Sequence, residues 1–195
     1  MKKRYHYDNR DHTFMVLAYG RSPFLEECIQ SLLAQTVKSR IVLATSTPND
    51  YLEDIADRYH LPMVVNPRGS SLAGDWDFAL HAAGTPIVTL AHQDDIYHKY
   101  YTADILKAAG KAKKPLIIHT DYWEIREDKI VEQNRLLLIK RLMLFPMRLP
   151  FLWESRFARR RILSLGNAIC CPSVSYVVEN LDGFHFRRNM KCNVD

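Results

Sequence analysis

The side chains best suited to chemistry are Asp94 and Asp95, in the run 92–95 (His-Gln-Asp-Asp) that follows an apolar segment over 86–90. A continuous apolar run of this length is typical of a strand buried on both faces. Adjacent carboxylates at its end suit a hard cation, because Mg²⁺ and Mn²⁺ prefer carboxylate oxygens and commonly share their ligands with phosphates. The same pair could instead form a turn in which Asp95 caps a helix beginning near Tyr97. The two interpretations are compatible, and the sequence leaves both open.

Other polar and aromatic side chains have weaker claims to a function. Arg68 lies in a Gly/Ser loop after a predicted strand and could reach a phosphate, although a solvated surface arginine fits equally well. Trp76 could stack on a base or a sugar, but a half-buried core tryptophan is the more common outcome. His81, His98 and His119 are interpreted as ordinary helix or strand residues, because no two of them have metal-ligand spacing. The glycine motifs of dinucleotide and Walker-type sites do not occur.

The first 120 residues alternate between apolar runs of strand length and amphipathic segments of helix length. We expect strands over 14–19, 40–46, 61–66, 86–90 and 116–120, and helices over 23–33, 51–60, 72–83 and 97–109. Ser22 is the expected cap of the first helix, with Pro23 in its first turn. Such alternation predicts an α/β fold with a mostly parallel central sheet and helices on both faces. Ligands of such sheets bind beyond the carboxyl ends of the strands, where Asp94 and Asp95 are expected.

The bulk composition is that of a soluble globular protein of one domain. The chain has 195 residues, of which 47% are hydrophobic and 25% charged. Its net charge of +5 suits an anionic partner, such as a nucleotide, a nucleic acid or an acidic membrane surface, without selecting one. The four cysteines match neither a zinc pattern nor a disulfide framework, which predicts reduced thiols and a cytoplasmic location. We find no signal peptide and no apolar run long enough to span a membrane.

After about residue 130 the sequence becomes rich in leucine, phenylalanine and basic residues. Between Val131 and Arg161 there are eight Arg or Lys residues and two acidic ones. Pro146 and Pro150 are expected to break any long helix there, and a turn and a strand are expected over 166–178. The stretch 136–161 has three interpretations: a flap over an acceptor site, a segment that contacts anionic lipids at the inner face of the cell membrane, or a core-packing helix with solvated arginines.

Several of these segments resemble, in order and spacing, family 2 of the inverting glycosyltransferases. Residues 25–36 (Leu-Glu-Glu-Cys-Ile-Gln-Ser-Leu-Leu-Ala-Gln-Thr) match the family's opening helix, and 17–21 occupy the turn before it. The run 92–95 stands where the family has its Asp-x-Asp-Asp metal motif. Residues 166–173 look like the acceptor-side segment, followed by a Gly-Phe element at 183–184. The resemblance covers about residues 13–195 and implies a single domain of the GT-A fold. Its nucleotide-sugar-binding part would be 1–125, and its helical, acceptor-side part 126–195.

The resemblance also implies roles at the donor site. Asp94 and Asp95 would hold Mn²⁺ or Mg²⁺ on the diphosphate of the donor, where the charge of the leaving group develops. Tyr19 and Arg21 lie in the turn that lines the family's nucleotide pocket. Arg68 is the remaining candidate for the donor nucleotide, through its phosphates.

The sequence departs from the family pattern in three respects. Thr45 and Ser46 stand where the second strand usually ends in acidic residues, one of which holds a uracil ring; either could hydrogen-bond a base, and uridine specificity is not expected from the sequence. His92 replaces the first acid of the metal motif. The family's general base is an aspartate beyond the acceptor segment, and Asp195, the last residue of the sequence, is the candidate at that position. Family members normally continue for tens of residues beyond this point.

The resulting hypothesis is an inverting, metal-dependent hexosyltransferase. It would act on a saccharide or lipid-linked acceptor, in a bacterial pathway of cell-surface polysaccharide biosynthesis. The alternative is a truncated or degenerate nucleotide-sugar-binding module without catalytic activity. Nucleic-acid binding through the basic stretch 136–161 is not expected, because no recognition motif accompanies the charge.

Overall fold

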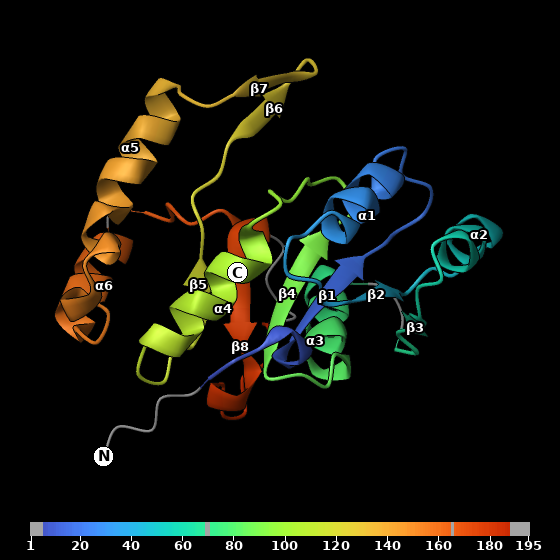
Figure 1. The fold of residues 1–195 in the computed structure, drawn as a ribbon, viewed down its shortest axis with the longest axis horizontal. Coiled ribbons are helices and arrows are strands. Elements are labelled where there is room, and N and C mark those ends of the chain that lie inside the picture. Colours follow the sequence, from blue (N-terminus) through green and yellow to red (C-terminus); the bar gives the residue numbers. More distant parts are fainter. Residues whose placement is uncertain (1–5, 69–70, 165, 188–195) are drawn as a thin grey trace.

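The centre of the computed structural model, which describes residues 6–68, 71–164 and 166–187, is a six-stranded sheet of order β3-β2-β1-β4-β8-β5 (Figure 1). Strands β3, β2, β1 and β4 pair in parallel, whereas β8 is antiparallel to both β4 and β5. The mostly parallel sheet is therefore confirmed, and the five strands predicted within the first 120 residues are present with ends within two residues of prediction. The further strand expected within 166–178 is β8. The strands are β1 (His12–Leu17), β2 (Arg40–Thr45), β3 (Met63–Val65), β4 (Ile87–His92), β5 (Ile117–His119) and β8 (Val174–Val177).

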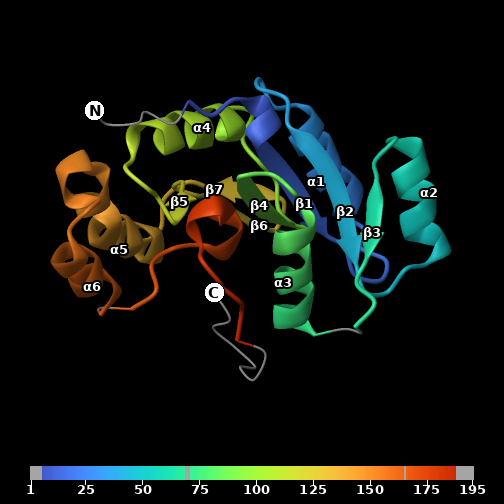
Figure 2. The same ribbon diagram turned by 90° about the horizontal axis from the view of Figure 1, so that it is seen from below.

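Helices cover both faces of this sheet, as predicted (Figures 1 and 2). Because successive side chains of a strand point to opposite faces, β1 divides its apolar residues between two cores. Phe14 and Val16 face one core, and Met15 faces the other. The first core is built against α1 (Leu25–Leu33), α2 (Asp50–Arg58) and α4 (Tyr101–Lys111), and the second against α3 (Leu72–Ala82).

The first helix begins later than predicted. Ser22 does not cap it: its Oγ accepts a hydrogen bond from the backbone N–H of Phe24 at 3.3 Å, which closes a turn, and α1 begins at Leu25. The N-cap position belongs to Phe24, which has helical backbone angles, so the helix is continuous with this turn. Its buried stripe of Leu25, Cys28, Ile29 and Leu32 is close to the predicted one.

The fourth helix also begins later, at Tyr101 rather than near Tyr97. The backbone N–H of Tyr97 donates to Ser31 Oγ at 3.0 Å, and its hydroxyl donates to the carbonyl of Pro172 at 2.9 Å. These bonds draw Tyr97 into the core and keep residues 97–100 out of the helix. Asp95 therefore does not cap α4, and the interpretation of this carboxylate as a helix cap is wrong.

The segment after β5 forms a hairpin and two helices, and the two helices lie beside the β5 edge of the sheet (Figures 1 and 2). The sequence did not predict the hairpin of β6 (Glu124–Arg126) and β7 (Lys129–Val131). Helix α5 (Arg135–Leu144) ends before Pro146, as expected, and two short 3₁₀ helices lead to α6 (Arg156–Leu163). Helix α5 buries Leu137, but most of its other apolar side chains are exposed, which contradicts the core-packing interpretation of 136–161. None of the helices in the described ranges is long and apolar enough to cross a membrane.

Candidate functional site

A pocket of about 340 Å³ opens where β1, β2 and β4 end, beside the start of α3. In the parallel register, Leu17 pairs with Ala44 on one side and with His92 on the other, so the carboxyl ends of three strands reach the same edge. Ligands of open parallel sheets bind at this edge. The lining residues are Leu17, Ala18, Tyr19, Ala44, Thr45, Ser46, Leu72, Asp75, Trp76, His92, Gln93 and Asp94.

The two carboxylates after β4 lie at this pocket. Asp94 is exposed and lines it, and Asp95 is half-buried next to it. Ligand atoms of His92, Asp94 and Asp95 all lie within 4.8 Å of one another. Burial raises the pKa of Asp95 to about 6, and the negative charge of Asp94 adds to this shift. Both causes disfavour a second negative charge, and a divalent cation between the carboxylates would offset them.

The ring of His92, at the place of the first acid of the motif, lies among Trp76, Asp95 and Cys171. Its ring packs against Trp76 with 5.3 Å between centroids. Its Nδ1 lies 3.8 Å from Oδ2 of Asp95, and its Nε2 lies 3.8 Å from Sγ of Cys171. Trp76 is 6% exposed, so it is a core residue as the sequence favoured, yet part of it lines the pocket. An imidazole thus takes the place of the first acid of the motif and lies beside the carboxylates of Asp94 and Asp95.

The loop after β4, residues 93–95, is called the acidic loop. Gln93 binds this loop to the turn after β1, a role that the sequence did not reveal. Its Oε1 accepts from the backbone N–H of Tyr19 at 3.0 Å, and its Nε2 donates to the carbonyl of Tyr19 at 3.3 Å. The side-chain amide thus pairs with the Tyr19 backbone as a neighbouring strand would. This pairing sets the separation of Tyr19 and Asp94 across the pocket.

The other side of the pocket is held by Asp75, which the sequence analysis did not single out. Its carboxylate accepts a hydrogen bond from Ser46 Oγ at 2.9 Å and another from Asn66 Nδ2 at 2.7 Å. One residue of α3 therefore fixes the ends of β2 and β3. Thr45 Oγ1 accepts from the backbone N–H of Thr47 at 3.1 Å, which tightens the turn after β2.

The predicted site residues fall into separate groups. Tyr19, Thr45, Ser46 and Asp94 line the pocket, and Asp95 adjoins it. The guanidinium carbon of Arg21 lies 5.9 Å from the ring centroid of Tyr51, in contact with α2. Arg68 lines a second pocket of about 440 Å³, which runs along α3 from Gly74 to Ala82. Asp195, the predicted base, lies outside the described residues.

The cysteines within the described ranges, Cys28, Cys170 and Cys171, are free thiols, as predicted. Cys28 is buried under the acidic loop and donates through its Sγ to the carbonyl of His92 at 3.3 Å. Burial raises its pKa to about 12, and the charges of Asp95 and Asp94 act in the same direction. The thiol is therefore protonated and serves to anchor the end of β4.

Comparison with known proteins identifies the family and the fold. The model of a family described as glycosyl transferase family 2 matches residues 13–175. Similar solved structures include S. aureus TarS 1-349 in complex with UDP, at 16% identity and TM-score 0.63, with 94% of this chain and 52% of that chain covered. The mannosyltransferase PcManGT from Pyrobaculum calidifontis, in complex with GDP-Man and Mn²⁺, has 15% identity and TM-score 0.61, over 94% of this chain and 49% of that one.

A third similar structure is glucosyl-3-phosphoglycerate synthase from Mycobacterium tuberculosis in complex with UDP, at 15% identity and TM-score 0.58, over 91% of this chain and 60% of that one. The chain thus spans between 49% and 60% of the length of these three structures. At such identities the likeness shows the fold, which is the GT-A fold expected from the sequence. No curated protein sequence is close enough to this one to count as a match.

Proposed function

The chain belongs to glycosyl transferase family 2, and on that premise we propose that it transfers a sugar from a nucleoside diphosphate sugar to an acceptor hydroxyl, with inversion. The observation that carries the proposal is the pocket at the carboxyl edge of the sheet, with Asp94 and Asp95 at its rim. A pocket of about 340 Å³ has the volume of a small-molecule site. Acidic side chains at the rim suit a diphosphate when a cation lies between them.

Asp94 and Asp95 are the proposed ligands of Mn²⁺ or Mg²⁺. The donor set fits such an ion, because two carboxylates are held together and the pKa of Asp95 is raised by burial and by its neighbour. When bound, the ion neutralises the negative charge that develops on the departing diphosphate. His92 holds the loop against Trp76 and offers a ring nitrogen beside the carboxylates.

The donor nucleotide is proposed to lie over the ends of β1 and β2. Tyr19 is 60% exposed and lines the pocket, so its ring is available for stacking on a base or sugar. Ser46 and Thr45 present hydroxyl groups in place of a carboxylate, which can bond a base without requiring uracil. Arg21 and Arg68 remain proposals for phosphate contacts, which would require their side chains to turn toward the donor.

The acceptor half of the reaction is assigned to residues 126–195, and the donor half to 1–125. Asp195 remains the proposed general base on the strength of its place after the acceptor-side segment. It would take the proton of the acceptor hydroxyl as the oxygen attacks the anomeric carbon from the face opposite the diphosphate. The natural acceptor is proposed to be a saccharide or lipid-linked hydroxyl in cell-surface polysaccharide biosynthesis.

The surface of α5, α6 and the 3₁₀ helices between them supports a peripheral contact with the inner face of the cell membrane. Leu142, Phe151 and Phe157 are each more than 70% exposed. Arginines such as Arg156 and Arg160 are also exposed on α6. Exposed aromatic and aliphatic side chains beside cationic groups fit an interface with anionic lipids, where a lipid-linked acceptor would lie. The free thiols agree with a cytoplasmic location.

Turnover tests the proposed function. The protein with Mn²⁺ is incubated with sugar conjugates of uridine, guanosine, thymidine and cytidine diphosphate, and release of the free nucleoside diphosphate is measured. We expect release from one donor, reduced about 100-fold or more in Asp94→Ala, the scale of loss when a preorganised electrostatic group is removed. Asp104→Asn, which removes an exposed carboxylate from α4, should be unchanged. Binding without release from any donor would favour the non-catalytic module.

A further inference from the structure

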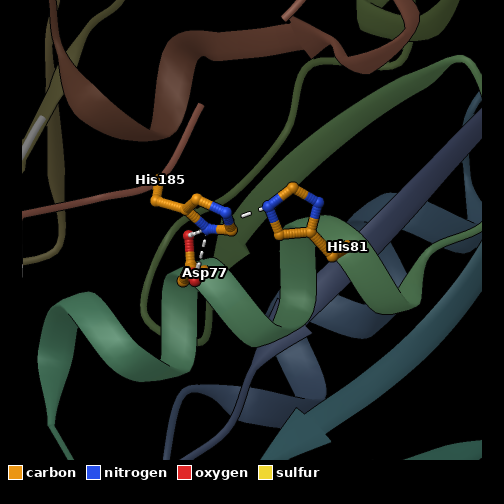
Figure 3. Close-up of side chains that lie close together, drawn as sticks. All are labelled: Asp77, His81 and His185. Atoms are coloured by element: carbon orange, nitrogen blue, oxygen red, sulfur yellow. Dashed lines mark hydrogen bonds and ion pairs between the residues drawn. The ribbon is translucent and has the colours of Figure 1, made fainter. Parts of the chain in front are cut away.

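A second group of potential metal ligands lies apart from the donor pocket, on the later turns of α3. Asp77 and His81 are four residues apart on one face of the helix and project toward His185 of the C-terminal segment (Figure 3). One ligand atom from each of the three residues lies within 4.8 Å of the other two. The group borders the pocket of about 440 Å³ that Arg68 also lines.

The distances in this group approach those of a metal centre. Nδ1 of His185 lies 3.0 Å from both carboxylate oxygens of Asp77, and Nε2 of His81 lies 3.8 Å from Oδ1 of Asp77. A tetrahedral ion with bonds of 2.0–2.1 Å keeps its ligand atoms about 3.3 Å apart. The measured separations of 3.0 and 3.8 Å lie on either side of this spacing.

The carboxylate of Asp77 is positioned from within the protein. Its side chain is 10% exposed, whereas those of His81 and His185 are 42% and 65% exposed. The backbone N–H of Phe186 donates to Oδ1 of Asp77 at 3.2 Å, which fixes the carboxylate against the C-terminal segment. The carbonyl oxygen of Phe184 lies 3.3 Å from Nε2 of His81, so a further oxygen donor borders the group. Two imidazoles and one carboxylate form a ligand set that occurs at zinc sites.

We propose that Asp77, His81 and His185 bind a borderline divalent ion such as Zn²⁺, at a site separate from the one at Asp94 and Asp95. Imidazole nitrogens favour zinc and its neighbours in the transition series, whereas the carboxylates after β4 favour Mg²⁺ or Mn²⁺. Three protein ligands leave a position for water or a further donor. The ion would join the segment around His185 to α3, the helix that also carries Asp75 and Trp76 of the donor pocket.

The test titrates Co²⁺ and Zn²⁺ into the Asp94→Ala variant, so that the proposed site at Asp94 and Asp95 does not contribute to binding. We expect one equivalent of Co²⁺ to produce visible absorption bands, Zn²⁺ to displace it, and Zn²⁺ to raise the melting temperature. His81→Ala and His185→Ala should each weaken Co²⁺ and Zn²⁺ binding more than about 10-fold. Loss of a residue that only hydrogen-bonds to a metal ligand already costs about 10-fold, and loss of a ligand should cost more. His98→Ala, which removes an exposed histidine from another loop, is the matched control.

Two outcomes would overturn the proposal. One is Co²⁺ and Zn²⁺ binding that is unchanged in both His81→Ala and His185→Ala. The other is the absence of stoichiometric binding in the parent variant while its circular dichroism is that of the wild type. In either case Asp77 and His185 would form only a hydrogen-bonded pair that holds the C-terminal segment against α3. Neither outcome depends on transferase activity.

Discussion

At the residue scale, His12 connects the central strands while remaining uncharged. It is fully buried in β1, with Nε2 2.8 Å from Thr89 Oγ1 of β4 and Nδ1 2.9 Å from Ser39 Oγ. Burial lowers its pKa to about 3. Both ring nitrogens therefore have neutral hydroxyl partners, and protonation would place a charge in the core.

This buried histidine predicts a pH-dependent stability. In the unfolded chain His12 takes up a proton below about pH 6.5, whereas in the folded chain it does so only near pH 3. Its contribution to the free energy of unfolding is thus complete above pH 6.5 and is lost at about 1.4 kcal/mol per pH unit as pH falls toward 3. Urea titrations at several pH values should show this extra slope in the wild type and its loss in His12→Gln. Equal slopes in the two proteins would contradict the assignment.

Asp75 gives a second residue-scale prediction. Asp75→Ala removes the acceptor for Ser46 Oγ and for the buried amide of Asn66. We expect a loss of about 1–3 kcal/mol in the free energy of unfolding, together with weaker nucleotide binding, because the end of β2 is released. Asp75→Asn retains a carbonyl acceptor and should lose less. Equal unfolding midpoints in Asp75→Ala and wild type would show that these bonds contribute nothing.

At the element scale, the sequence predicted the elements with strong local signals. Continuous apolar runs identified β1, β2 and β4, whose side chains are buried on both faces. The β6–β7 hairpin was missed because its turn residues, Glu127 and Asp128, are not a pair that predicts the positive φ angles they adopt, 49° and 58°. Such turns are recognised by Asn-Gly or Asp-Gly, and neither occurs here. The start of α4 was misplaced because a tertiary hydrogen bond of Tyr97 decides it, and that of α1 because Ser22 closes a local turn with Phe24 instead of capping the helix.

The site was predictable where its residues directly follow a strand of the parallel sheet, because the carboxyl ends of such strands meet at one edge. Asp94 and Asp95 follow a strand directly, so their position at the sheet edge could be inferred. The group of Asp77 and His185 joins residues 108 positions apart, which no local spacing reveals. The contact of the Gln93 amide could not be inferred from local spacing either, because its partner Tyr19 lies 74 positions away.

At the scale of the whole molecule, the exposed surface of α5 and α6 predicts binding to anionic vesicles. The double variant Arg156→Glu and Arg160→Glu should weaken binding to phosphatidylserine-containing vesicles about 10-fold or more, since each basic side chain near such a surface contributes about 1 kcal/mol. Lys107→Glu with Lys111→Glu on α4 is the matched control. Vesicle sedimentation at low and high salt measures the effect. Equal binding to neutral and anionic vesicles, or equal loss in both double variants, would contradict a contact through this surface.

The central claim is that the carboxyl edge of the sheet binds a nucleotide through a metal held by Asp94 and Asp95. Its most direct test is calorimetric titration of uridine, guanosine, thymidine and cytidine diphosphates, with and without Mn²⁺, into the wild type, Asp94→Ala and Asp104→Asn. We predict that one nucleotide binds, that it requires Mn²⁺, and that Asp94→Ala abolishes the binding while Asp104→Asn retains it. Binding that persists without Mn²⁺ or in Asp94→Ala, or no binding of any of the four nucleotides, would contradict the account.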